Sequence, residues 1–122
     1  MIKKANEYSP LVLAYIGDAV FELYVRKRLV KSTFMPVDKL HKAATGYVSA
    51  TAQSGSFKKI ESKLTEHEIS VYKRGRNSKS TVPKNTDMID YRIATGLETL
   101  IGYIYLMDKA ERLDEIMSMI LD

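Results

Sequence analysis

Two carboxylates stand out because each lies in the middle of a strongly apolar segment. Asp18 lies within residues 11–28, directly after Gly17, and Glu98 lies within residues 94–106. Burying an isolated carboxylate among aliphatic side chains is costly unless something compensates its charge. Each acid therefore requires a cation, a metal ion or a hydrogen-bond network. The likeness of the two segments suggests that the acids share one site.

Residue types alone leave two interpretations of these acids open. Each carboxylate could pair with an arginine or lysine, or cap a neighbouring helix. Alternatively, the two could bind a divalent cation such as Mg²⁺, which prefers oxygen ligands and retains several waters. Such an ion activates water and stabilises the charge that develops on a phosphodiester under attack, which is nuclease chemistry. Glu22 lies on the same helix face as Asp18, but its spacing favours a salt bridge with Arg26.

A basic segment would complement a phosphodiester site. Residues 69–86 contain no acid but several lysines and arginines. Within them, residues 75–85 are polar, contain Gly and Pro and lack apolar periodicity, so we predict a loop, and long loops are commonly functional. The cations could form a solvated face or contact phosphates. The candidate phosphate contacts are Arg74, Arg76, Lys79, Lys84 and Asn85.

Apolar periodicity and capping residues predict an all-α domain of five to seven helices over residues 1–122. Ser9 before Pro10 predicts one helix start, and Thr65 with Glu68 forms the pattern of a capping box. No segment alternates long enough to predict a strand. The predicted elements are a loose lead-in (1–8), helices over 11–30, 35–54, 57–64, 65–74 and 86–107, a final helix over 108–122, and the loop over 75–85.

The bulk composition narrows the possible classes of protein. A net charge of +4 favours a polyanionic partner. The absence of cysteine excludes disulfides and thiolate metal sites. Two histidines are too few and too scattered for a zinc cluster. The first ten residues lack the apolar core of a secretory signal, and no run reaches the length of a membrane span, so a cytoplasmic location is expected.

Three sequence motifs go further than composition. Residues 15–20 (YIGDAV) resemble the ribonuclease III signature, whose family form ends in F-L-G-D-A. Residues 94–102 (ATGLETLIG) resemble that family's second acidic motif, A-D-x-x-E-A-x-x-G, and residues 74–77 (RGRN) also look like family sequence. The resemblance extends over nearly the whole chain and is closest to the small bacterial Mini-ribonuclease III subfamily, which lacks a double-stranded-RNA-binding domain.

The resemblance implies the all-α ribonuclease III endonuclease fold and a homodimer. It places Asp18 and Glu98 at the family's catalytic, Mg²⁺-binding positions. Two other acids of the larger enzymes are replaced here by Ala14 and Thr95, so waters or substrate oxygens would complete the coordination of the ion.

The implied activity is hydrolysis of double-stranded RNA, with maturation of the 23S ribosomal RNA precursor as its role. A ribosomal protein of the large subunit is an implied helper. Two alternatives remain open: a non-catalytic dimeric module that binds structured RNA, and a plain helical interaction domain. Cleavage distinguishes the enzyme from both alternatives, and salt-sensitive RNA binding distinguishes the module from the interaction domain.

Overall fold

The computed structural model describes residues 7–122, which contain six α-helices and no strand. The predicted all-α class and helix number are therefore confirmed for these residues. Within the described part of the chain, no helix is both long and apolar enough to cross a membrane. The elements are α1 (Pro10–Ser32), α2 (Val37–Val48), α3 (Ala50–Ile60), the short 3-10 helix η2 (Glu61–Lys63), α4 (Glu66–Arg76), α5 (Met88–Leu106) and α6 (Ala110–Leu121).

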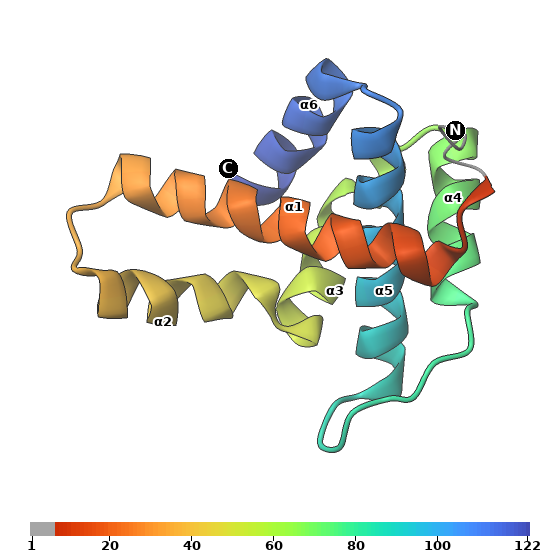
Figure 1. Ribbon diagram of the computed structural model, residues 1–122, viewed down its shortest axis with the longest axis horizontal. Coiled ribbons are helices and arrows are strands. Elements are labelled where there is room, and N and C mark those ends of the chain that lie inside the picture. The colour runs from red at the N-terminus through yellow and green to blue at the C-terminus, as the bar shows by residue number, and fades with distance from the viewer. Residues whose placement is uncertain (1–6) are drawn as a thin grey trace.

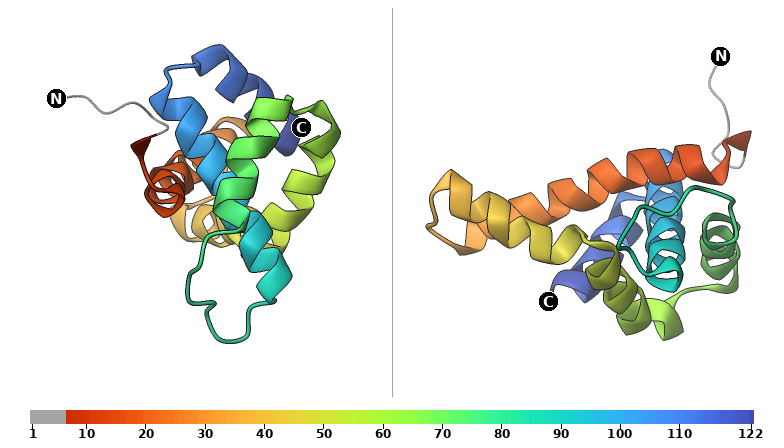
Figure 2. Two further views of the ribbon diagram at one scale, coloured as in Figure 1. Left: turned by 90° about the vertical axis from the view of Figure 1, so that its right-hand side faces the viewer. Right: turned by 90° about the horizontal axis from the view of Figure 1, so that it is seen from below.

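Helix α5 is the centre of the structure and contacts α1, α3, α4 and α6. Helix α1 crosses α5, while α2 runs back along the C-terminal half of α1, so that these two helices extend from the rest of the molecule as an arm (Figure 1). The two further views show α3 and α4 packed on α5 beside this crossing (Figure 2). Residues far apart in the sequence are thereby brought together where α1, α3 and α5 meet.

The helices begin at residues whose side chains accept backbone hydrogen bonds. Ser9 accepts from the backbone N–H of Val12 at 3.3 Å, and Pro10 follows at the first helical position. Thr65 and Glu68 form the complete capping box at the start of α4. Asp87 caps α5. These local signals fix the starts of α1, α4 and α5 as the sequence predicts.

The second predicted helix differs from the structure because its break lies earlier than expected. The chain turns at Ser49, which has an extended backbone and caps α3 by accepting from the N–H of Ala52. Residues 54–56, predicted to end a helix, lie inside α3 instead. Ser56 donates its hydroxyl to the carbonyl of Ala52, a bond that a helical backbone permits. The predicted piece over 57–64 is therefore the end of α3 followed by η2.

Helix α4 continues two residues beyond the predicted end, to Arg76. Gly75 lies inside this helix because it packs closely on α5: an added Cβ would lie 2.1 Å from Oγ1 of Thr99. The glycine therefore serves close packing and does not stop the helix. The loop accordingly occupies residues 77–87, slightly later than predicted.

The crossing of α1 and α5 depends on two glycines. A Cβ on Gly17 would lie 1.8 Å from the carbonyl oxygen of Glu98, and one on Gly102 would lie 1.9 Å from that of Leu13. The backbones of the two helices are thus in direct contact. This close approach places Asp18, the residue after Gly17, beside the turn of α5 that carries Glu98.

We predict that Gly17→Ala loses about 3 kcal/mol or more of unfolding free energy, the upper end of overpacking costs, because rigid backbone opposes the new methyl group. The matched control is Gly55→Ala on α3, where an added Cβ meets nothing within 4 Å. This control should gain about 0.5–1 kcal/mol from helix propensity. Urea denaturation followed by circular dichroism measures both, and equal stabilities would contradict the close crossing.

Candidate active site

The two acids lie together where α1 crosses α5. Their carboxyl groups are hydrogen-bonded to each other, with Asp18 exposed and Glu98 partly buried. The structure therefore brings together the two carboxylates that the sequence analysis predicted to share a site. Their role as ion ligands stays a prediction.

The proximity of the two carboxyl groups changes the protonation of one of them. Burial, followed by the hydrogen bond and the charge of Asp18, raises the pKa of Glu98 from 4.5 to about 9. Two adjacent carboxylates cannot both be charged without a large cost, so one retains a proton. At neutral pH the protonated Glu98 donates a hydrogen bond to Asp18. A cation placed between the two carboxylates would replace that proton and neutralise their mutual repulsion.

The sequence analysis missed a third member of the site, Gln53 of α3. Its side chain is 1% exposed, and its Nε2 donates to Oε2 of Glu98 at 3.4 Å. The predicted helix end over residues 54–56 hid this residue. A usable signal was present, because Gln53 precedes the apolar residues Phe57 and Ile60 at helical spacing and so shares their buried face.

The residues present fit a hard divalent cation. The acid pair supplies carboxylate oxygens, and the exposed Asp18 leaves the pair open to water and substrate, as a Mg²⁺ site with few protein ligands requires. Within residues 7–122 no group of three or more His, Cys, Asp or Glu side chains is placed to bind a metal. Ala14 and Thr95 are both 8% exposed, and the Thr95 hydroxyl donates to the carbonyl of Tyr91. The ion would therefore depend on the acid pair.

Glu22 bonds to a neighbour on its own helix and not to the acid pair. It forms a salt bridge with Arg26 at 2.9 Å, one helical turn further along α1, as the sequence spacing predicts. This pair is exposed, so its contribution to stability is small.

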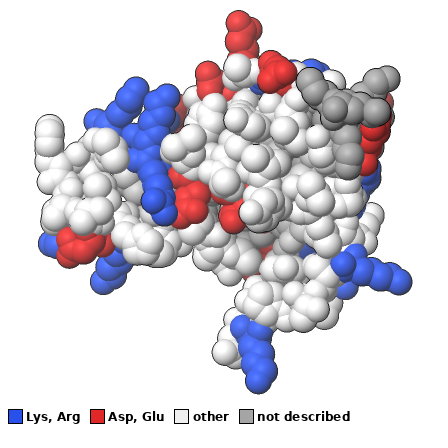
Figure 3. Space-filling model, viewed as in Figure 1, with Lys and Arg blue, Asp and Glu red and all other residues white. Residues whose placement is uncertain are grey.

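The candidate phosphate contacts divide into two groups. Arg74 and Arg76 lie on α4, where Arg74 donates to the carbonyl of Tyr8 at 3.2 Å and Arg76 lies over the ring of Tyr72. The other three candidates belong to the loop, and Figure 3 shows Lys and Arg side chains projecting from the lower edge of the molecule, where the loop lies in Figure 1. These loop residues are Lys79, Lys84 and Asn85, all exposed.

Comparison with known proteins identifies the family. A family model described as the ribonuclease III domain matches residues 11–109. The chain belongs to the ribonuclease III family. It is 50% identical to the Mini-ribonuclease 3 of Clostridium tetani over 119 residues, which cover 96% of this chain and 79% of the relative. It is 47% identical to the Mini-ribonuclease 3 of Enterococcus faecalis, over 93% of this chain and 88% of the relative.

A solved structure agrees with this assignment. The crystal structure of a protein from Fusobacterium nucleatum is 35% identical and superposes with a TM-score of 0.87, covering 98% of this chain and 97% of that one. The resemblance to Mini-ribonuclease III and the ribonuclease III fold are therefore confirmed. The chain is an endoribonuclease of a family that acts on double-stranded RNA and uses divalent metal ions.

The raised pKa of Glu98 predicts how stability depends on pH. The folded state holds this proton more tightly than the unfolded state, so the contribution to stability is present below pH 4.5 and is lost as pH rises toward 9. We expect Glu98→Gln to remove this dependence. In EDTA the variant should be more stable than wild type at pH 8.5, and the difference should shrink at pH 5.

Chemical denaturation at both pH values tests this expectation, with circular dichroism to confirm an unchanged fold. Stability differences that are equal at the two pH values would contradict the burial and pairing of the Glu98 carboxyl group.

Proposed function

We propose that this endoribonuclease hydrolyses double-stranded RNA with Mg²⁺ bound by Asp18 and Glu98, which are its catalytic residues. The observation that carries the proposal is the direct pairing of the two carboxyl groups from α1 and α5. Such a pair holds a proton at neutral pH, and a divalent cation neutralises it better than a proton does.

The residues of the pair have different tasks in this proposal. When bound, the ion supplies an activated water and stabilises the negative charge on the scissile phosphate. Asp18, being exposed, faces the substrate side of the site and binds from the surface. Glu98, partly buried and held by Gln53, would bind the ion from inside as a deprotonated carboxylate. Substrate oxygens and waters would complete the coordination in place of the acids absent at Ala14 and Thr95.

The basic residues suit the backbone of an RNA duplex. Double-stranded RNA is recognised mainly through phosphates and 2′-hydroxyls, so flexible exposed cations fit it. Lys79 and Lys84 meet this description on the loop, and Asn85, with a backbone φ of 63°, forms a tight turn beside Lys84. Arg74 and Arg76 would contact phosphate from the end of α4 while retaining their partners within the protein.

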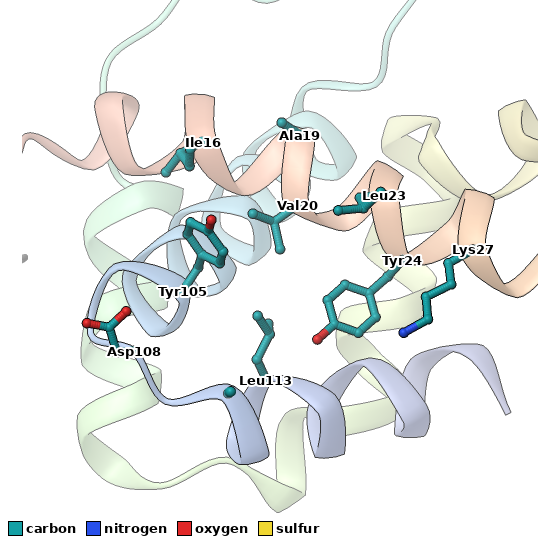
Figure 4. Close-up of a pocket in the computed structure, with 10 residues that line it drawn as sticks. Ile16, Ala19, Val20, Leu23, Tyr24, Lys27, Tyr105, Asp108 and Leu113 are labelled. Carbon is teal, nitrogen blue, oxygen red and sulfur yellow. The ribbon is translucent and has the colours of Figure 1, made fainter.

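An apolar surface along α1 supports a homodimer. Tyr15 of α1 is 83% exposed, and a groove of about 670 Å³ runs along the same helix toward α6. Figure 4 shows Val20 and Leu23 of α1 facing Tyr105 and Leu113 across this groove. A projecting aromatic ring and an apolar recess on one helix are self-complementary, as a two-fold contact requires. A second copy would then bring a second acid pair for the opposite RNA strand.

The finer biological role follows from the resemblance to Mini-ribonuclease III. We propose the 23S ribosomal RNA precursor as the substrate, matured at both ends in the cytoplasm. A ribosomal protein of the large subunit that binds near the cleavage site is the proposed helper.

The central test is cleavage of a long double-stranded RNA by wild type and Asp18→Asn. We expect cleavage by wild type with Mg²⁺, no cleavage in EDTA, and a loss of at least about a hundredfold in the variant, because a missing ligand removes the ion. Circular dichroism serves as the fold control. RNA binding without cleavage by wild type in any divalent metal would favour the non-catalytic binding module instead.

The loop contacts are tested by Lys79→Gln combined with Lys84→Gln. Within residues 7–122 neither lysine has internal partners like those of the α4 arginines. We expect weaker RNA binding and a salt dependence reduced by about one unit of log–log slope for each lost phosphate contact. The control pair is Lys39→Gln with Lys42→Gln on α2, both exposed. An unchanged slope in the loop variant would exclude the loop from the RNA surface.

The dimer is tested by sedimentation velocity at micromolar concentration. We expect a dimer for wild type and a monomer for Leu23→Lys, because a charge at this 65% exposed position would be buried in the contact. The control is Phe34→Lys, a fully exposed apolar residue in the connection between α1 and α2. A monomeric wild type would contradict the proposed assembly.

A further inference from the structure

Gln53 is a buried polar side chain that belongs to neither acidic motif. It is 1% exposed on α3, and within residues 7–122 its side-chain hydrogen bond is the one to Oε2 of Glu98. Burying an amide is unfavourable unless it is hydrogen-bonded. An apolar residue of similar length would fill this part of the core at lower cost, so the amide requires an explanation.

The neighbouring residue, Ser54, is a buried polar side chain that serves as a comparison for Gln53. Ser54 is equally buried, at 1% exposed, yet its hydroxyl has no hydrogen-bond partner in the described part of the chain. Gln53 and Ser54 thus share a helix and a degree of burial, but only the amide reaches the acid pair. This difference associates Gln53 with the site and not merely with the core.

Three helices meet at the Glu98 carboxyl group. Asp18 contacts it from α1 and Gln53 from α3, while Glu98 itself extends from α5. A glutamate side chain has several rotatable bonds, whereas Mg²⁺ demands near-octahedral geometry from its few ligands. Hydrogen bonds from outer residues commonly orient carboxylate ligands and tune their binding. The single N–H bond from Gln53 uses one acceptor site of Oε2, so a deprotonated Glu98 would retain further acceptor sites for an ion.

We propose that Gln53 is a positioning residue, whose buried amide fixes the Glu98 carboxylate in the orientation that binds the divalent ion together with Asp18. This inference rests on the proposed function, because it assigns Glu98 to the ion. The Gln53 Nε2 and Glu98 Oε2 atoms lie 3.4 Å apart, at the long end of the hydrogen-bonding range.

The test replaces Gln53 by Met, which keeps the length and burial of the side chain but cannot donate to Glu98. Mn²⁺ binding without RNA, measured by calorimetry, gives a readout independent of activity, and the Mg²⁺ dependence of cleavage gives a second. We expect both apparent metal affinities to weaken about 10–100-fold, with an unchanged KM for RNA. The matched control is Ser54→Ala, which should leave metal affinity and KM unchanged.

A second variant covers the case in which Gln53→Met fails to fold. Gln53→Asn retains the amide but withdraws it by one methylene from Oε2 of Glu98, and it should show the same weakened metal affinity. A variant with altered thermal stability but wild-type Mn²⁺ affinity and Mg²⁺ dependence would overturn the proposal, because a core residue alone would behave in this way.

The same measurements separate this proposal from the proposed function. Wild type that cleaves RNA with Mg²⁺ establishes the function, whatever Gln53 does. If wild type binds Mn²⁺ more tightly than Gln53→Met but cleaves no double-stranded RNA, the contact with Glu98 is supported and the function is overturned. Wild type that binds no Mn²⁺ and cleaves no double-stranded RNA with Mg²⁺ overturns both.

Discussion

The site depends on the direct backbone contact between α1 and α5. Gly17 and Gly102 allow this approach, because a side chain at either position would meet a carbonyl oxygen of the other helix. A wider crossing would move Asp18 away from Glu98 and separate the acid pair. The glycine in the G-D-A motif is therefore as necessary to the site as the aspartate that follows it.

The close crossing carries an energetic cost that the rest of the fold must offset. Burial and pairing hold a proton on Glu98 at neutral pH, which disfavours the folded state as pH rises. The surrounding apolar core stabilises the site by excluding water from α5. The Glu68–Arg112 salt bridge, at 2.7 Å, connects the start of α4 to α6, and Arg112 also lowers the pKa of Glu68. Contacts outside the acid pair thereby offset the cost of burying Glu98.

The excess positive charge is not uniformly available to a substrate. Several cations bind carboxylates or backbone carbonyls of other helices and so serve the fold; examples are Arg28, Lys59 and Arg112. The exposed lysines of the loop, Lys79 and Lys84, make no such bonds to other helices within the described residues. Net charge therefore indicated a polyanionic partner, while the structure shows which cations remain accessible to one.

The sequence alone determined the helical class, the helix starts at Ser9 and Thr65, and the two acids, because capping, periodicity and motif residues are local signals. It could not determine the break at Ser49 or the contact of Gln53 with Glu98, because these depend on packing between helices distant in the chain. The spacing of Gln53 from Phe57 and Ile60 indicates only that Gln53 is buried. Ser and Gly near residue 55 favour a helix end locally, but α3 packs on α5 and continues through them. The tertiary structure decided that the Gln53 amide contacts Glu98, because only the folded chain brings α1, α3 and α5 together at this carboxylate.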